Sequence, residues 1–187
     1  MKAVICTKYG GPEVLQIREV PVPIPKSNEV KIKIYATSVT AADFRIRSFT
    51  IPPAYKLIAR FVLGFTKPRK SILGVEFSGV VEEVGSSVTK FKKGDKVFAA
   101  TLNQFGAYAE YICMPETATI SPMPQNSSFA EAATLPIGAL TANHFIKAAQ
   151  LTPNKKILIY GASGSVGTYA LQLAKLTGAE ITAVSSL

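Results

Sequence analysis

The chain has 187 residues, of which 48% are hydrophobic, and it carries a net charge of +9. This length allows one good hydrophobic core or two small ones, so we expect a globular protein. No uninterrupted apolar run approaches the roughly 18 residues that a membrane span needs, and residues 1–8 alternate like a strand instead of forming a signal peptide. We therefore expect a cytoplasmic protein.

The two cysteines, Cys6 and Cys113, are far apart in the sequence, with no Cys-x-x-Cys pair and no neighbouring histidine. This spacing argues against a zinc site and against a disulfide framework. Buried, inert thiols are the expected state.

The first part of the chain is predicted to be rich in β-strands. Half-buried strands alternate apolar and polar residues, and this pattern occurs over residues 2–7, 14–20 and 30–36. The third of these segments places Val30 and two isoleucines on one face and two lysines on the other. Glycine and proline turns separate short strands, which predicts a small barrel.

Basic residues gather in one stretch of the first part. Residues 45–70 contain seven Lys or Arg and no acidic residue, and residues 56–65 can form a short amphipathic basic helix. A membrane or nucleic-acid role is the alternative that this charge suggests. An anionic cofactor gives the same excess, and no helix-turn-helix, metal finger or RNA-binding signature is present. We therefore expect residues 45–70 to line or cover the active-site cleft.

The pattern changes near residue 128, where alanine-rich helices are predicted over residues 129–135 and 138–151. We place the domain boundary near residues 120–128, with a first domain over 1–124 and a second over 125–187. The second part continues with a strand (155–160), a glycine-rich turn, a helix (165–177) capped by Gly178, and a strand (181–184).

This order of elements is typical of a pyrophosphate-binding βαβ unit. Glycine lets the backbone amides of the turn and the positive end of the helix approach the anion. The usual fingerprint places its first glycine where Ala162 stands, and Gly164 and Gly167 follow as the second and third. The turn ends Gly167-Thr168 without a lysine, which disfavours a P-loop. The alternative is a glycine-rich connection without a ligand.

Several segments together resemble the medium-chain dehydrogenase/reductase superfamily, in its zinc-independent quinone oxidoreductase (zeta-crystallin-like) branch. The matching segments, colinear along nearly the whole chain, are residues 74–85, 88–97, 106–111, 132–136 with Thr141-Ala142, and 161–167. The resemblance implies a β-rich GroES-like barrel followed by an α/β Rossmann-type dinucleotide-binding domain, with NADPH in the cleft between them. It implies hydride transfer to a small-molecule quinone or α,β-unsaturated carbonyl.

The sequence departs from the zinc-dependent alcohol dehydrogenases of this superfamily. Alanines replace their catalytic cysteine near Asp43, and Val75 replaces the histidine of their Gly-His-Glu triplet, which leaves Glu76. One carboxylate does not hold Zn²⁺, which takes three or four ligands, so we expect no metal. Without a Lewis acid, the acceptor must already be electron-poor.

The resemblance also implies roles for single residues. The pyrophosphate would lie against Ala162, Ser163, Gly164, Ser165, Val166 and Gly167. Thr141 resembles the threonine near the nicotinamide ribose. Asp43 and Arg47 match an Asp-x-x-x-Arg pattern at the cleft, where they either contact substrate or form an ion pair that stabilises the fold. The quinone reductases' pocket asparagine and tyrosines are Thr40, Arg45 and Ile51 here. Tyr55, Tyr108 or water would supply a proton.

The end of the second strand predicts the choice of cofactor. NAD-preferring sites carry an Asp or Glu there, to bind the ribose 2′-OH. This chain has Ser185 and Ser186, which can donate to a 2′-phosphate, so we expect a preference for NADPH, supported by a Lys or Arg beyond Leu187. Strand-end loop residues without a role are the alternative.

The chain after Lys155 has room for one βαβ unit of about 30 residues, whereas a complete dinucleotide-binding domain has six parallel strands. We therefore expect an N-terminal fragment whose exposed sheet causes self-association, or a homo-oligomer, with no nucleic-acid or membrane partner. The alternatives are a non-enzymatic GroES-like module whose truncated nucleotide unit does not bind, and a basic membrane- or nucleic-acid-associating protein.

Overall fold

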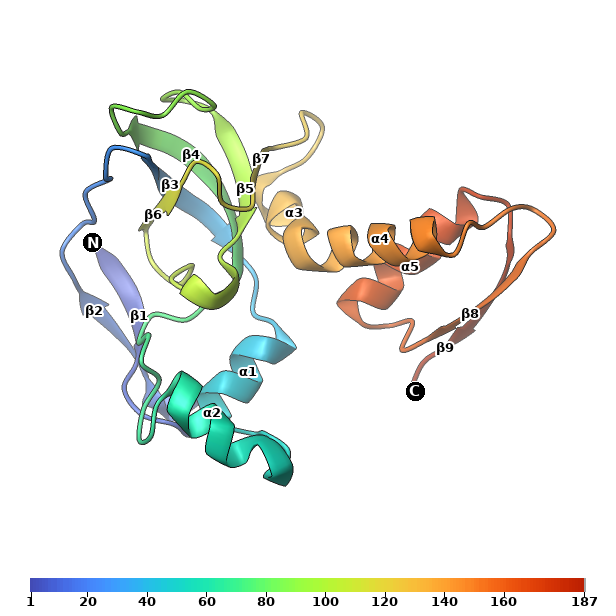
Figure 1. The fold of residues 1–187 in the computed structure, drawn as a ribbon, viewed down its shortest axis with the longest axis horizontal. Helices are drawn as coiled ribbons and strands as arrows, with labels where there is room; N and C mark the ends of the chain where they lie inside the picture. Colours follow the sequence, from blue (N-terminus) through green and yellow to red (C-terminus); the bar gives the residue numbers. More distant parts are fainter. Residues whose placement is uncertain (187) are drawn as a thin grey trace. The chain divides into compact units, whose positions relative to one another are not determined.

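The structure, a computed structural model, describes residues 1–186. The chain divides into two compact units, Met1–Ala133 and the remainder from Thr134 onward. The first unit is mainly β-structure and the second contains helices and a pair of strands (Figure 1). Within the described residues, no helix has the length and apolar character that crossing a bilayer requires.

A five-stranded antiparallel sheet forms the centre of the first unit. Its strands, in spatial order, are β6 (Tyr111–Pro115), β3 (Glu29–Thr37), β4 (Glu76–Val84), β5 (Lys96–Ala100) and β7 (Ile120–Pro122). The long pair β3–β4 carries two register shifts, between Lys31 and Ile32 and between Ile34 and Ala36. Such bulges bend strands and increase their twist, which lets the sheet curve around its core.

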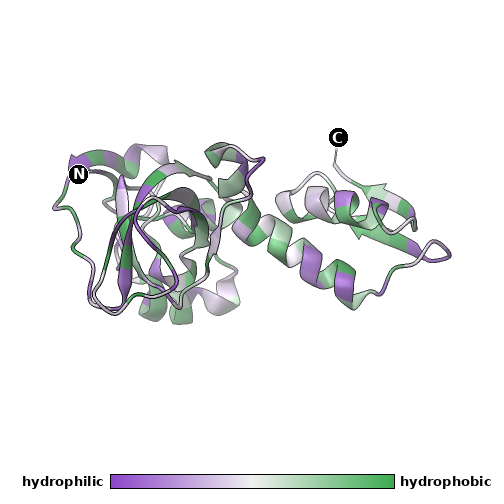
Figure 2. Cartoon of the chain, turned by 90° about the horizontal axis from the view of Figure 1, so that it is seen from above, coloured by the Kyte–Doolittle hydropathy of each residue, from purple (hydrophilic) through white to green (hydrophobic). Residues whose placement is uncertain are grey.

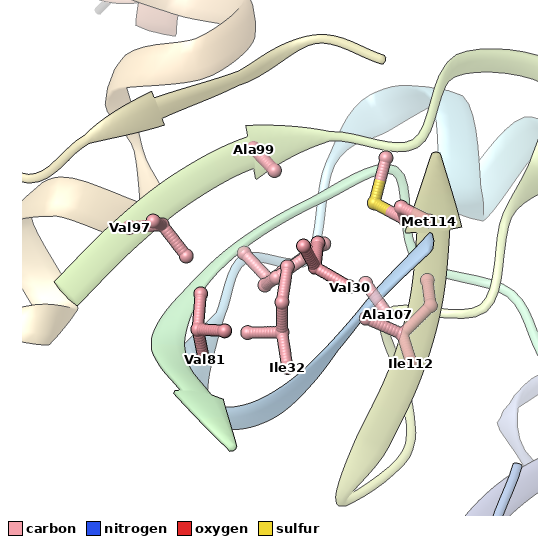
Figure 3. Packing of buried hydrophobic residues seen from close by; sticks show 9 residues of the cluster. Val30, Ile32, Val81, Val97, Ala99, Ala107, Ile112 and Met114 are labelled. Atoms are coloured by element: carbon pink, nitrogen blue, oxygen red, sulfur yellow. The ribbon is translucent and has the colours of Figure 1, made fainter. Parts of the chain in front are cut away.

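The core of this unit lies on the concave side of the sheet. Side chains from four strands converge there around Ile32 and Val81 (Figure 3). Val30 and Ile32 are fully buried, whereas Lys33 on the opposite face of β3 is exposed. This confirms the alternation predicted for the third strand.

A separate antiparallel hairpin precedes the sheet. It consists of β1 (Lys2–Cys6) and β2 (Leu15–Glu19), with the 3-10 turn Pro12–Val14 just before β2. Two isolated bridges, Ala3 to Ala109 and Ile5 to Ile72, connect β1 to the rest of the unit. The hairpin is therefore joined to the segments around Ile72 and Ala109, which lie outside the five strands of the main sheet.

Helical segments of the first unit lie between and after its strands. They are α1 (Ala41–Ser48), α2 (Lys56–Leu63), α3 (Phe129–Ala133) and the 3-10 turns Pro53–Tyr55 and Leu102–Gln104. The helix α3 packs on the sheet, where Phe129 stacks on Tyr35 and Ser78 donates a hydrogen bond to the Phe129 carbonyl. Because of these contacts the division falls after Ala133, whereas the sequence prediction placed it after residue 124.

The second unit is one parallel βαβ unit preceded by helix. A π-helical turn (Leu135–Ala139) and α4 (Leu140–Ala148) lead to β8 (Lys156–Tyr160), α5 (Ser165–Lys175) and β9 (Glu180–Val184). The strands pair in parallel, with Ile157 opposite Ile181, and the pair is mostly hydrophobic (Figure 2). Gly178, at φ 73°, follows α5 in the left-handed conformation expected of a helix-ending glycine. The predicted strand–turn–helix–strand order is confirmed.

Candidate active site

An open cavity of about 670 Å³ lies within the first unit, and most of its wall is apolar. The wall comes from the hairpin, from the end of β3, from α1 and from residues 107–110. Three of the four residues predicted to be catalytic line it: Asp43, Arg47 and Tyr108. The fold thus brings Tyr108 to the same wall as Arg47 and Asp43, which precede it by 61 and 65 positions in the sequence.

Asp43 is buried at the first turn of α1, and its carboxylate is fully engaged. It accepts hydrogen bonds from the Thr40 amide (3.0 Å), the Thr40 hydroxyl (2.6 Å) and the amide of Gly74 (3.1 Å). With Thr40 it forms a capping box, which satisfies amides that a helix start leaves without partners. Asp43 therefore ties α1 to the loop before β4.

The hydrogen-bond partner of Arg47 is not Asp43. Its guanidinium donates to the Gly10 carbonyl at 2.8 Å and lies 5.5 Å from the centre of the Phe44 ring. Across residues 1–186 the ion pairs are Lys31 with Glu83 and Lys156 with Glu180, so Asp43 and Arg47 do not form one. Both remain at the cavity wall, where Arg47 is the half-buried cation.

Tyr108 places a phenol at the same wall. Its hydroxyl donates to the Ser38 carbonyl at 3.3 Å. Burial raises the pKa of Tyr108 well above its ordinary value, and the charge of Asp43, a hydrogen bond with that carboxylate and the charge of Glu76 raise it further. Tyr108 is therefore a neutral hydrogen-bonding group at physiological pH.

Tyr55 lies elsewhere. It ends the 3-10 turn Pro53–Tyr55, its side chain is 63% exposed, and it is not part of the cavity wall. Between Arg47 and Leu73, no residue contributes to that wall. The basic segment 45–70 thus meets this cavity only through Arg47.

The structure adds wall residues that the sequence analysis did not select. They include Lys2, Tyr35, Thr37, Phe44 and Glu110. The amide of Lys2 donates to the Glu110 carboxylate at 2.8 Å, beside the bridge between Ala3 and Ala109. Tyr35 follows Lys31 and Lys33 on the outward face of β3, and an aromatic residue on a polar face is a signal that the sequence did contain.

The glycine-rich turn of the second unit connects β8 to α5. Gly167 is buried, and a Cβ atom there would lie 2.3 Å from the Gly161 carbonyl oxygen and 2.8 Å from Ala162 Cα. Only glycine permits this close approach of helix and turn, which is the role of the third glycine in dinucleotide-binding fingerprints. Gly164 is the N-cap of α5.

The predicted cofactor residues differ in exposure. Ser163, Gly164, Ser165 and Val166 are exposed at the turn and at the first turn of α5. Ala162 is buried, and its amide donates to the Val184 carbonyl at 2.9 Å. The amides at the start of α5 have no acceptor within the helix. They can therefore donate to an anion, which is the usual way in which a helix N-terminus binds one.

The remaining predicted residues lie on neighbouring elements of the same unit. Thr141 is half-buried in α4, and Ser185 and Ser186 are exposed directly after β9. The backbone of the turn is tied to this strand end, because the Gly161 and Ala162 amides both donate to the Val184 carbonyl. Ser185 therefore follows a residue that is bonded to the glycine-rich turn.

Neither thiol has a reactive environment. Burial raises the pKa of Cys6, and it raises the pKa of Cys113 to about 11. Since the thiolate is the nucleophile, both thiols are unreactive near neutral pH. Both cysteines are free.

A β domain of this kind followed by a dinucleotide-type βαβ unit is the architecture of the alcohol dehydrogenase superfamily, and comparison with known proteins agrees. Residues 26–125 match the alcohol dehydrogenase GroES-like domain family. The chloroplastic quinone-oxidoreductase homolog of Spinacia oleracea is 39% identical over 98% of this chain and 55% of its own length. The chain belongs to the medium-chain dehydrogenase/reductase superfamily, in its quinone oxidoreductase family.

Solved structures support the same assignment. The quinone oxidoreductase from Coxiella burnetii superposes with a TM-score of 0.84 at 34% identity, covering 100% of this chain and 56% of that chain. The Escherichia coli quinone oxidoreductase complexed with NADPH superposes with a TM-score of 0.82 at 30% identity, covering 100% and 53%. The chain thus spans about half the length of the relatives it matches.

Proposed function

We propose that this chain carries the GroES-like domain and the first nucleotide-binding unit of an NADPH-dependent, zinc-independent oxidoreductase. Its acceptor would be a quinone or an α,β-unsaturated carbonyl. The observation that carries the proposal is the contact between the start of α5 and the glycine-rich turn, where Gly167 leaves no room for a side chain. Membership of the quinone oxidoreductase family supports it.

The residues at this turn fit a dinucleotide. The amides of Ser165, Val166 and Gly167 at the start of α5 would bind the pyrophosphate, and the hydroxyls of Ser163 and Ser165 would donate to it. Thr141 would contact the nicotinamide ribose region. When bound, NADPH supplies the hydride, and the protein's part is to hold and orient it.

The donor atoms of the chain support chemistry without zinc. Among residues 1–186, no three His, Cys, Asp or Glu side chains lie close enough to hold a metal ion. Glu76, the carboxylate left at the metal-binding motif, accepts a hydrogen bond from the Ser38 hydroxyl in a buried position. Without a Lewis acid to polarise it, the acceptor must already be electron-poor, as quinones and enones are.

The proton for the reduced acceptor would come from solvent. A phenol whose pKa is raised gives up its proton less readily than ordinary tyrosine, so Tyr108 is a weak acid for this step. Its role would be to hold Ser38 and Asp43 in place at the cavity wall. Tyr55, away from the wall, would have no part in the step.

Cofactor titration tests the proposal, with NADPH and NADH added to this chain and to a longer form that includes the rest of the domain. We expect tighter binding and a higher kcat/KM with NADPH. Ser185→Asp, which places a carboxylate after β9, should shift the preference toward NADH, while Thr182→Asp within β9 should not. Equal values for the two cofactors would contradict the choice of NADPH. A folded chain that binds neither in the longer form would indicate a non-enzymatic module.

A further inference from the structure

The outward face of α2 is apolar. Leu57, Ile58, Phe61 and Val62 recur with helical spacing, and Phe65 follows just after the helix ends. These five residues, called the stripe below, are 69%, 63%, 57%, 65% and 55% exposed. A surface helix normally turns such a stripe toward the core and its polar residues toward water. Here the arrangement is reversed, so the stripe is unpartnered within the described residues of the first unit.

Contacts on the opposite side fix this orientation. The guanidinium of Arg60 lies 4.0 Å from the centre of the Phe49 ring and 5.2 Å from that of Tyr9. The Tyr9 hydroxyl donates to the Gly64 carbonyl at 3.0 Å, directly after the helix. The stripe therefore faces outward because the other face is held by specific contacts, and the rings of Phe61 and Phe65 pack edge to face at 5.1 Å within it.

Exposed cations lie at both ends of α2: Lys56 begins the helix, and the Arg69 amide donates to the Leu63 carbonyl at its end. Residues 45–70 contain seven basic residues and no acidic one. Lys56, Lys67, Arg69 and Lys70 are exposed, whereas Arg60 is engaged beneath the helix. An apolar stripe bordered by exposed cations is the chemistry of a helix that lies in the interface of an anionic bilayer.

We propose that α2 docks the first unit on an anionic lipid surface, with the stripe in the headgroup region and the four exposed cations on lipid charges. A second copy seated on the same face would bring two sets of cations together, which opposes dimerisation there. A nucleic-acid duplex would pair with the cations and leave the stripe in water, and a single strand would stack on its two phenylalanines and leave Leu57, Ile58 and Val62 in water. A helix of eight residues is too short to span, so the contact is peripheral.

This proposal differs from the sequence expectation that residues 45–70 cover the active-site cleft. The sequence contained the amphipathic pattern, but it did not show which face of the helix meets the protein. The contacts of Arg60 and Tyr9 answer that question and turn the apolar face outward.

Co-sedimentation with vesicles of phosphatidylcholine, with and without phosphatidylserine, tests the proposal on the full chain. We expect binding only with phosphatidylserine and weaker binding at high salt. Phe61→Ser with Val62→Ser should lower the partition coefficient at least about tenfold. Changing Lys56, Lys67, Arg69 and Lys70 to Gln should lower it at least about tenfold, since each cation near such a surface is worth about fivefold.

Matched control variants separate docking through α2 from the general effect of positive charge and of exposed apolar side chains. Ile24→Ser with Leu176→Ser removes two side chains that are each 84% exposed, and it should leave binding unchanged. Changing the exposed Lys26, Lys90, Lys92 and Lys93 to Gln removes the same charge elsewhere on the first unit and should have less than a threefold effect. Circular dichroism verifies that each variant is folded.

A fluorescence reporter gives a second readout that does not depend on loss of binding. The chain has no tryptophan, so Phe61→Trp introduces a single one. Its emission should shift to shorter wavelength on anionic vesicles, and that of Leu176→Trp should not. Unchanged emission at position 61, a dimer in lipid-free solution that Phe61→Ser dissociates, or equal binding to single-stranded DNA would each overturn the proposal.

Discussion

At the scale of single residues, Asp43 shows how one side chain serves both the fold and the cavity wall. It caps α1, holds the Gly74 amide and contributes to the raised pKa of Tyr108. The Asp-x-x-x-Arg pattern alone leaves substrate contact and an ion pair equally open. The structure assigns Asp43 a hydrogen-bonding role at α1 and gives Arg47 a separate partner, the Gly10 carbonyl.

Two glycines of the turn give a matched pair of substitutions. Gly167→Ala should destabilise the second unit by about 1–3 kcal/mol, because its Cβ would meet the Gly161 carbonyl oxygen at 2.3 Å. Gly164→Ala places its Cβ 3.3 Å from the same oxygen at an ordinary φ of −75°, so it should cost less than about 1 kcal/mol.

Thermal unfolding and NADPH titration measure the two effects. Under the proposed function, Gly164→Ala retains the fold and weakens NADPH binding at least about tenfold, because a side chain at the exposed turn holds the pyrophosphate away. If Gly167→Ala unfolds at the same temperature as the unaltered chain, α5 can move away from the turn without loss of stability. The close approach would then not be what requires glycine at position 167.

At the scale of elements, the pair β8–β9 is covered on one face only. Ile157 and Ile159 pack in a small core with residues of α4 and α5, whereas Leu158 is 65% and Tyr160 86% exposed on the other face. A two-stranded parallel sheet with an apolar outer face favours association with other apolar surfaces.

Self-association of this chain should therefore depend on that face. We expect Leu158→Lys with Tyr160→Lys to shift sedimentation toward the monomer at concentrations where the unaltered chain associates. Asn154→Lys with Gln172→Lys adds the same charge at exposed positions outside β8 and β9, and it should leave the association unchanged. Association that persists unchanged in the Leu158 and Tyr160 variant would place the contact elsewhere.

At the scale of the whole molecule, the groups with raised pKa gather in the first unit. Burial is the main cause for Cys6, Tyr9, Tyr108 and Cys113. Each such group keeps its proton to a higher pH in the folded state than in the unfolded chain. Its contribution to stability is therefore complete below the unfolded pKa and is lost as pH rises through the folded pKa.

The first unit should accordingly lose stability in alkali. For Cys113 the window runs from the ordinary value of 9.0 to about 11. The midpoint of urea unfolding should fall between pH 7 and 11. Above pH 9 the midpoint of Cys113→Ser should fall less steeply than that of the unaltered chain, and below pH 8 the two midpoints should differ by a constant amount. Parallel curves over the whole range would contradict this assignment.

The sequence by itself determined the features that depend on neighbouring residues. Alternation predicted β1, β2 and β3, because strand faces repeat every two residues. The strand–glycine–helix order predicted the parallel unit of β8, α5 and β9, since each of its signals is local. Motif order along the chain identified the family, which the comparisons confirm.

Only the tertiary structure decided which distant residues meet. It placed Tyr108 beside Asp43, put Tyr35 and Lys2 in the cavity wall, and left Tyr55 outside it. It also decided which face of α2 is exposed, because the ring of Phe49 and the hydroxyl of Tyr9 come from other parts of the chain. Local patterns fix the periodicity of a helix, but the direction in which its apolar face points depends on contacts between residues far apart in sequence.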